Sequence, residues 1–232
     1  MKRLLAVIPG VRWIRNRLAA CRRLCEWSTS AAYWESRYKR GGTSGGGSYG
    51  RLAEFKAEVL NAFVEKQQIA SVIEFGCGDG NQLQYARYPA YVGLDVSRDA
   101  IHRCADRFRD DPTKSFFLYV PDCFVDRTRV FCADLAVSLD VLFHLVEDKT
   151  FELYLQHFFQ SAARYAIIYS SNEDRPQVSL HERHRRFIDY VAEKFPEWLL
   201  VDTVKNRYPW SESDRIDTSL ADFHIYAKSN GC

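Results

Sequence analysis

The chain has 232 residues, of which 47% are hydrophobic and 14% aromatic, enough to bury the core of one large domain and to exclude an intrinsically disordered protein. The formal net charge of +2 is unevenly distributed. Residues 1–26 hold seven Lys or Arg and one acid, a net charge of +6, and the remaining residues carry −4. Because a negatively charged body grips phosphates poorly, we expect no nucleic-acid partner.

Residues 11–27 place apolar side chains at helical spacing with arginines between them, which predicts a short basic amphipathic helix. Two interpretations stay open for it: a helix on the anionic inner membrane surface, or a helix docked on its own domain. No run of about 18 apolar residues, the length of a membrane-spanning helix, is present. The seven cysteines show no disulfide or zinc spacing, which favours reduced thiols and a cytoplasmic location.

The segment from Gly41 to Gly50 is rich in Gly and Ser and has aromatic neighbours on both sides. It is either a plain linker or a lid that closes over a bound ligand, and the flanking aromatics favour the lid. We therefore divide the chain into residues 1–50, which comprise the amphipathic helix and the lid, and residues 51–232, which form the main domain.

The apolar pattern is helical from Leu52 to Gln68. After it, short apolar runs predict strands at 70–75, 90–95, 114–120, 133–139, 164–170, 197–204 and 222–228, and helical patterns occupy 81–86, 98–108 and 141–163. Strands that alternate with helices predict an α/β fold: a doubly wound, seven-stranded, mostly parallel sheet with helices on both faces. The last two strands are predicted to form a closing hairpin.

The residues VIEFGCGDGNQL, at 72–83, join the first predicted strand to the next helical pattern. A strand that ends in a glycine-rich turn makes a nucleotide-binding corner, because the bare backbone can approach a ligand closely. The spacing is GxGxG rather than the GxGxxG of dehydrogenases, and Glu74 stands two residues before the first glycine.

The stretch EFGCGDG resembles the first motif of the class I S-adenosylmethionine (SAM)-dependent methyltransferases, an acid followed by x-G-x-G-x-G. YVGLDVS adds Asp95 at the end of the next strand, 21 residues after Glu74, and ADLAVSLDVLFHLVED resembles the family's fourth strand and following turn. The resemblance covers residues 50–170 and implies the Rossmann-like methyltransferase fold with SAM as cofactor.

The resemblance also implies individual roles in cofactor binding. The glycines and Glu74 would form and order the corner under the methionine part of SAM, and Asp95 would hold the ribose, since an acid at that strand end has little structural need. Asp122 would either face the adenine amino group or cap a turn. The residues assigned to the cofactor are Glu74, Gly76, Cys77, Gly78, Asp95, Val96, Asp122 and Leu139.

The acceptor side is predicted from the residues after the fourth strand. Methyl transfer is an in-line displacement in which the protein aligns the reactants and supplies a base for a weakly acidic acceptor. His144, five residues past Leu139 and close to Asp140, is the predicted general base, and a histidine packed on a helix face is the alternative. A basic turn-to-helix segment at 179–187 is either an acceptor site or a solvated helix face. The residues assigned to the acceptor are His181, His184, Arg185 and Tyr49.

A magnesium site made of His144, His181, His184 and Asp140 is not favoured, because magnesium prefers oxygen ligands and no tight acidic cluster is visible. The stretch YWESRYKRGGTSGGGSYGRLAEFKAEVLNAFV looks like bacterial methyltransferases that accompany polysaccharide biosynthesis enzymes. We therefore expect O-methylation of a saccharide or another small hydroxylated acceptor. The alternatives are a non-catalytic SAM-binding partner of a glycan-assembly complex and a nicotinamide-dependent oxidoreductase, which the glycine spacing opposes.

Overall fold

The computed structural model describes residues 29–177 and 179–229. The predicted amphipathic helix at 11–27 lies outside this range. Among the described residues, none of the helices combines the length and the apolar character that crossing a membrane requires.

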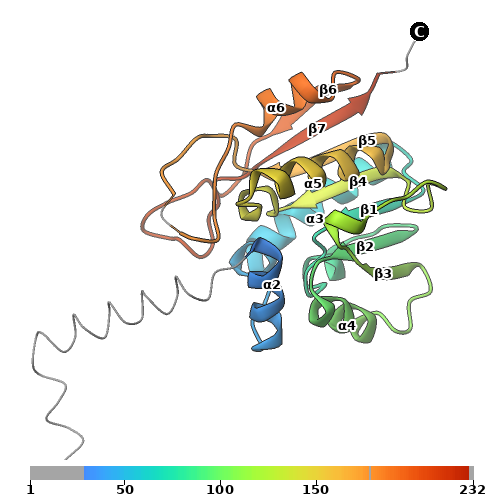
Figure 1. The fold of residues 1–232 in the computed structure, drawn as a ribbon, viewed down its shortest axis with the longest axis horizontal. Coiled ribbons are helices and arrows are strands. Elements are labelled where there is room, and N and C mark those ends of the chain that lie inside the picture. The colour runs from blue at the N-terminus through green and yellow to red at the C-terminus, as the bar shows by residue number, and fades with distance from the viewer. Residues whose placement is uncertain (1–28, 178, 230–232) are drawn as a thin grey trace, which may run out of the picture.

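One seven-stranded sheet organises the chain, with strand order β3-β2-β1-β4-β5-β7-β6 (Figure 1). The strands β1 to β5 pair in parallel, and β7 runs antiparallel to both β5 and β6. This confirms the predicted α/β fold and its closing hairpin. The strands are β1 Val72–Phe75, β2 Tyr91–Asp95, β3 Lys114–Leu118, β4 Ala133–Leu139, β5 Ala162–Ser170, β6 Trp198–Val204 and β7 Asp222–Lys228.

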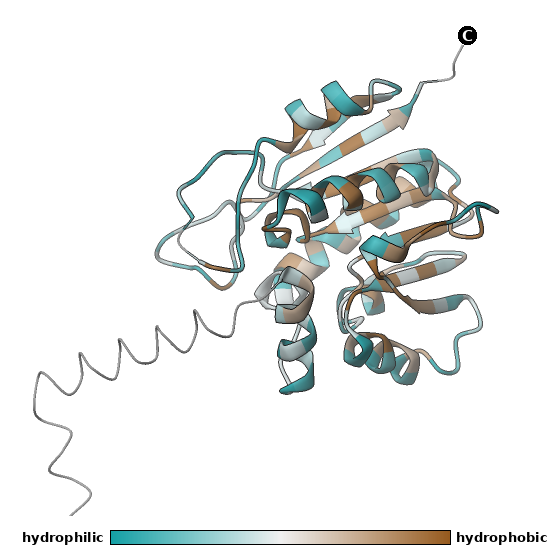
Figure 2. Ribbon diagram, in the orientation of Figure 1, coloured by the Kyte–Doolittle hydropathy of each residue, from teal (hydrophilic) through white to brown (hydrophobic). Residues whose placement is uncertain are grey.

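Helices cover both faces of the sheet and bury a separate apolar cluster on each. On one face, Phe55 and Leu60 pack with Val137 of β4. On the other face, Phe158 and Val191 pack with the strand residues whose side chains point to that face. Hydrophobic residues accordingly gather on the central strands, while α5 has both hydrophobic and hydrophilic sides (Figure 2). The helices are α2 Ser30–Lys39, α3 Gly50–Lys66, α4 Arg98–Arg107, α5 Asp148–Gln160 and α6 Phe187–Lys194.

Two predicted helical segments differ from the structure. Residues 81–86 form only a 3-10 turn, η2 (Gln82–Tyr85), because Asn61 of α3 takes the carbonyl of Tyr85 and the N–H of Arg87. Residues 141–147 form an irregular loop around η4 (Leu142–His144) before α5 begins. The segment 179–186 is also irregular, and α6 starts only at Phe187.

Candidate functional site

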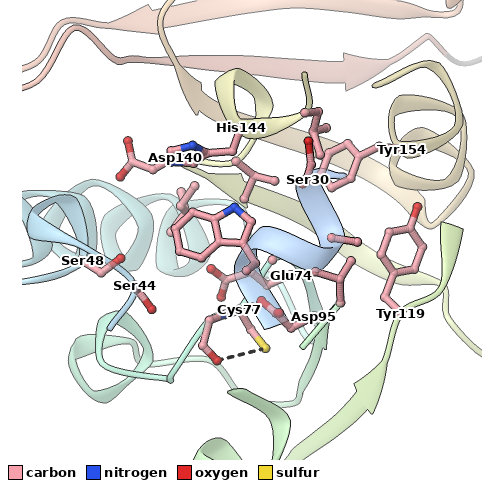
Figure 3. A pocket seen from close by; sticks show the side chains of 18 of the residues that line it. Ser30, Ser44, Ser48, Glu74, Cys77, Asp95, Tyr119, Asp140, His144 and Tyr154 are labelled. Carbon is pink, nitrogen blue, oxygen red and sulfur yellow. Dashed lines mark hydrogen bonds between the residues drawn. The ribbon is translucent and has the colours of Figure 1, made fainter. Parts of the chain in front are cut away.

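A cavity opens where β1, β2 and β4 end, and residues of α2 line it as well (Figure 3). The carboxyl edge of a parallel sheet is the usual place for ligands in this architecture. Most of the predicted site residues meet here, although they come from distant parts of the sequence. Those in the cavity wall are Glu74, Gly76, Cys77, Gly78, Asp95, Val96, Leu139, Asp140 and His144.

The glycine corner has the left-handed backbone that its spacing suggested. Gly76 and Gly78 have φ angles of 83° and 59°, a region that side chains rarely adopt. A Cβ atom on Gly76 would lie 2.5 Å from Cγ2 of Val141, and one on Gly78 would collide with Ser44 and with the hydroxyl of Tyr38. The corner is therefore closely surrounded, and only glycine fits at these two positions.

Asp95 ties the end of β2 to this corner. The N–H groups of Gly78 and Ser97 each donate a 2.9 Å hydrogen bond to one of its two carboxylate oxygens. Burial of the side chain raises its pKa to about 6. The carboxylate thus has a structural task that the sequence interpretation had denied it, and it keeps lone pairs for a ligand, because a carboxylate can accept about four hydrogen bonds.

Glu74 is buried beside the corner and accepts a 2.7 Å hydrogen bond from the hydroxyl of Tyr91. Its burial raises its pKa to about 7. The nearest cation is Lys56 of α3, a residue that the sequence interpretation missed. The signal was present, since Lys56 lies between Leu52 and Leu60 at four-residue intervals, on the buried stripe of its helix.

Lys56 is fully buried, and its Nζ lies 2.7 Å from Oδ2 of Asp140. Asp140 directly follows β4 and has a φ of 57°, a conformation that aspartate tolerates better than most residues. Its N–H donates to the carbonyl of Tyr169 in β5, which fixes the turn. The ion pair therefore connects α3 to the loop that carries His144.

The Gly-rich segment at 41–50, the predicted lid, is hydrogen-bonded to the turn that contains the glycine corner. The N–H of Ser44 donates to Asp79, and the N–H of Asp79 donates back to the hydroxyl of Ser44, both at 3.0 Å. The hydroxyl of Tyr49 also donates to Asp79, at 2.9 Å, so this predicted acceptor residue anchors the segment and does not line the cavity.

His144 faces Glu74 and Asp95 across the cavity (Figure 3). Its Nδ1 lies 2.9 Å from the carbonyl oxygen of His181. A carbonyl can only accept, so Nδ1 carries the proton and Nε2 is the unprotonated nitrogen. Desolvation lowers the pKa of the ring to about 3. The edge of Trp34 from α2, another residue the sequence interpretation missed, packs against it with ring centroids 4.9 Å apart.

The basic cluster at 179–187 contributes little to the cavity wall. His181 stacks on His144 at a centroid distance of 5.8 Å. His184 is engaged by the hydroxyl of Ser171 at 2.6 Å. Arg185 donates to the carbonyls of Leu145 and Val146 at 2.6 and 2.8 Å, and so supports the loop after β4.

Asp122 lies outside the cavity wall as well. Its side chain is 67% exposed and pairs with Lys149 at 2.5 Å on the protein surface. This position does not support the predicted contact with adenine. Over residues 29–177 and 179–229, no group of three or more His, Cys, Asp or Glu side chains is arranged to hold a metal ion.

Comparison with known proteins finds no matching family model. Over 115 residues, 47% of the chain, it is 32% identical to an mRNA cap guanine-N(7) methyltransferase of Cryptococcus neoformans var. neoformans serotype D (strain JEC21 / ATCC MYA-565). The chain spans only 18% of the length of that relative. The narrower resemblance to enzymes of polysaccharide biosynthesis gains no support from these comparisons.

Solved structures match over more of the chain. The N-methyltransferase NodS of Bradyrhizobium japonicum WM9, in complex with S-adenosyl-L-homocysteine (SAH), superposes with a TM-score of 0.61 at 14% identity, over 77% of this chain and 86% of NodS. The methyltransferase domain of bacterial CtHen1-C gives 0.58 at 19% identity, over 77% and 100%. Magnesium protoporphyrin IX methyltransferase of Synechocystis PCC 6803 gives 0.57 at 14% identity, over 76% and 83%. The chain therefore has the Rossmann-like fold of the class I SAM-dependent methyltransferases.

Proposed function

We propose that this protein is a class I SAM-dependent methyltransferase that transfers a methyl group to a hydroxyl of a small acceptor, and that a saccharide is the acceptor class to test first. The observation that carries the proposal is the cavity itself. Its wall includes the glycine corner, Asp95 and His144, and the Nδ1 atom of His144 is engaged by the carbonyl of His181, which supports an unprotonated Nε2.

The residues at the corner fit SAM. Gly76 and Gly78 give the corner its left-handed backbone and present bare main chain to the cavity, and Asp95 retains lone pairs for the two ribose hydroxyls. Glu74 and Asp95 place carboxyl groups near a ligand that carries positive charge, which favours SAM electrostatically. When bound, SAM supplies a methyl group that is already activated for displacement, so the chain mainly has to align the acceptor.

His144 would align that acceptor. Its Nε2 can accept a hydrogen bond from an acceptor hydroxyl, because the carbonyl of His181 keeps the proton on Nδ1. With a pKa of about 3, the ring is too weak a base to ionise an alcohol in advance. It can still take the proton once methyl transfer has made the oxygen positively charged and strongly acidic. Lys56 and Asp140 would act as positioning residues, because their pair holds the loop that carries His144.

The test uses the full chain with labelled SAM and a panel of saccharides. We expect His144→Ala to keep the affinity for SAH within about twofold and to lower methyl transfer by about 10²-fold, the usual effect of losing the alignment of an acceptor. Calorimetry measures the first quantity and incorporation of label the second. If the purified protein binds no SAH, or if the variant transfers methyl at the normal rate, the proposal is wrong.

A second candidate acceptor is a ring nitrogen. Two observations favour it: the sequence match to a cap guanine-N(7) methyltransferase and the low pKa of His144. Such a nitrogen has a free lone pair and no proton to lose, so it needs no base. For this acceptor, His144→Ala should leave turnover on a guanine nucleotide nearly unchanged, which separates the two candidates.

A further inference from the structure

A buried amide oxygen in the cavity wall has no partner within the described residues. Gln82, in η2 directly after the glycine corner, is 7% exposed and lines the cavity. Its Nε2 donates a 2.9 Å hydrogen bond to the carbonyl of Ala53 in α3. Its Oε1 receives no hydrogen bond from the described chain. The other buried side-chain atoms without a partner, on Tyr169, His224 and Tyr226, do not belong to this cavity wall.

The orientation of this amide follows from its chemistry. A backbone carbonyl can only accept, so the NH₂ group of Gln82 must face Ala53 and the oxygen must point away from it. Leaving a buried acceptor unpaired is unfavourable by about 1–3 kcal/mol. A polar atom in this state on the wall of a binding cavity indicates that a ligand supplies the missing donor.

The position of Gln82 identifies which part of the cofactor can reach it. Asp95, the proposed ribose ligand, ends β2, and Tyr119 and Pro121 of the cavity wall follow the neighbouring strand β3. With the ribose at Asp95, adenine would take the part of the cavity next to Tyr119 and Pro121, and the methionine tail would then run the other way, across the corner after β1. Gln82 lies in that direction, held by α3 and next to Asn81, which donates to Ser48 of the lid segment.

Within the methionine tail, only one group can donate a hydrogen bond. The sulfonium carries no proton, and the carboxylate accepts, so the donor must be the α-ammonium. Given the SAM-dependent function proposed above, we infer that Oε1 of Gln82 accepts a hydrogen bond from the α-ammonium of SAM and of SAH. Gln82 is then a cofactor-binding residue that selects adenosyl sulfur compounds with an intact amino-acid tail.

The experiment is a cycle of two proteins and two ligands measured by calorimetry. The proteins are wild type and Gln82→Met, which preserves volume and removes the acceptor. The ligands are SAH and its analogue without the α-amino group. Wild type should bind SAH about 10- to 100-fold more tightly than the analogue, the range of a hydrogen bond to a charged group. In Gln82→Met this preference should fall by at least about fivefold, and the remainder would come from the carboxyl groups of Glu74 and Asp95.

Controls keep the outcome interpretable. Gln84→Met changes an exposed glutamine in the same turn, bonded only to Asn81, and should preserve the preference for SAH. The inference is overturned if Gln82→Met keeps the full preference, or if it weakens both ligands equally, since that indicates a purely structural role. Should Gln82→Met not fold, wild type that binds both ligands equally would overturn it as well. Absence of SAH binding by wild type would instead reject the proposed function.

Discussion

The two sides of the cavity differ in how their polar residues are used. On the cofactor side, Asp95 and Glu74 lie in the cavity wall, and each has a further hydrogen bond that holds the corner or the sheet. On the acceptor side, His184 and Arg185 turn toward the protein itself, to Ser171 and to the backbone after β4. A dense group of basic residues is therefore a weaker guide to a binding site than a turn whose backbone must be bare.

The reason is physical. A close backbone approach leaves a direct trace in the sequence, because only glycine adopts the required φ angles without strain. Other residues of the cavity wall, such as Ser30 and Trp34, reach it through the placement of α2. No local motif marks such residues.

The largest expected effect concerns the ion pair between Lys56 and Asp140, which connects α3 to the loop that carries His144. Lys56→Met should lower the free energy of unfolding by about 3 kcal/mol, because it leaves the carboxylate of Asp140 without its buried partner. Chemical denaturation monitored by tryptophan fluorescence measures the change. The double variant Lys56→Met/Asp140→Asn should recover part of the loss.

Lys205→Met is the matched control, because Lys205 pairs with Asp222 while its own side chain is 80% exposed. Pairs of this kind contribute about 1 kcal/mol or less. If Lys56→Met and Lys205→Met lower the free energy of unfolding equally, the buried pair contributes no more to stability than an exposed pair.

The second effect concerns the glycine corner. Gly78→Ala should weaken SAH binding at least about tenfold, because its Cβ would collide with Ser44 and Tyr38 and displace the lid segment. Gly41→Ala is the control, since Gly41 also has a positive φ, of 83°, but a Cβ there meets nothing within 4 Å. If both variants bind SAH with the same affinity, backbone strain alone explains any loss of binding, and the collision with Ser44 and Tyr38 does not affect it.

The sequence was informative about secondary structure where a local pattern of residues marks an element. All seven strands were predicted, because each is a short apolar run between turn residues, and the mostly parallel sheet was predicted because helical patterns lie between most of them. The helix predicted at 141–163 was wrong at its start because apolar periodicity does not show that residues 141–147 are held as a loop by Arg185.

The candidate site was predictable at the glycine corner and at the ends of β2 and β4, and hidden in the residues that α2 contributes and in those that support the wall. Lys56 was missed because a charged residue on a helix is ordinarily placed in solvent, and only its position on the apolar stripe marks it as buried. The backbone bonds of Asp95 could not be foreseen either, since they depend on how the corner folds back onto β2.

A third expected effect is a pH dependence of stability that arises from Glu74. The pKa of Glu74 is raised by burial from 4.5 to about 7 in the folded protein. Between these values the folded state binds more protons than the unfolded state, so stability falls as pH rises toward 7. Glu74→Gln removes the titrating group, and its free energy of unfolding should vary less between pH 5 and pH 8 than that of wild type.

The same shift predicts proton release on cofactor binding. The positive charge of bound SAM favours the ionised carboxyl and lowers its pKa, so near pH 6.5 part of a proton should leave as SAM binds. Calorimetry in two buffers of different ionisation enthalpy measures this release directly. Glu74→Gln should reduce the release without abolishing it, because Asp95, with a pKa raised to about 6, contributes as well. A release that Glu74→Gln leaves unchanged would place the titrating group elsewhere and remove Glu74 from the charged surroundings of the cofactor.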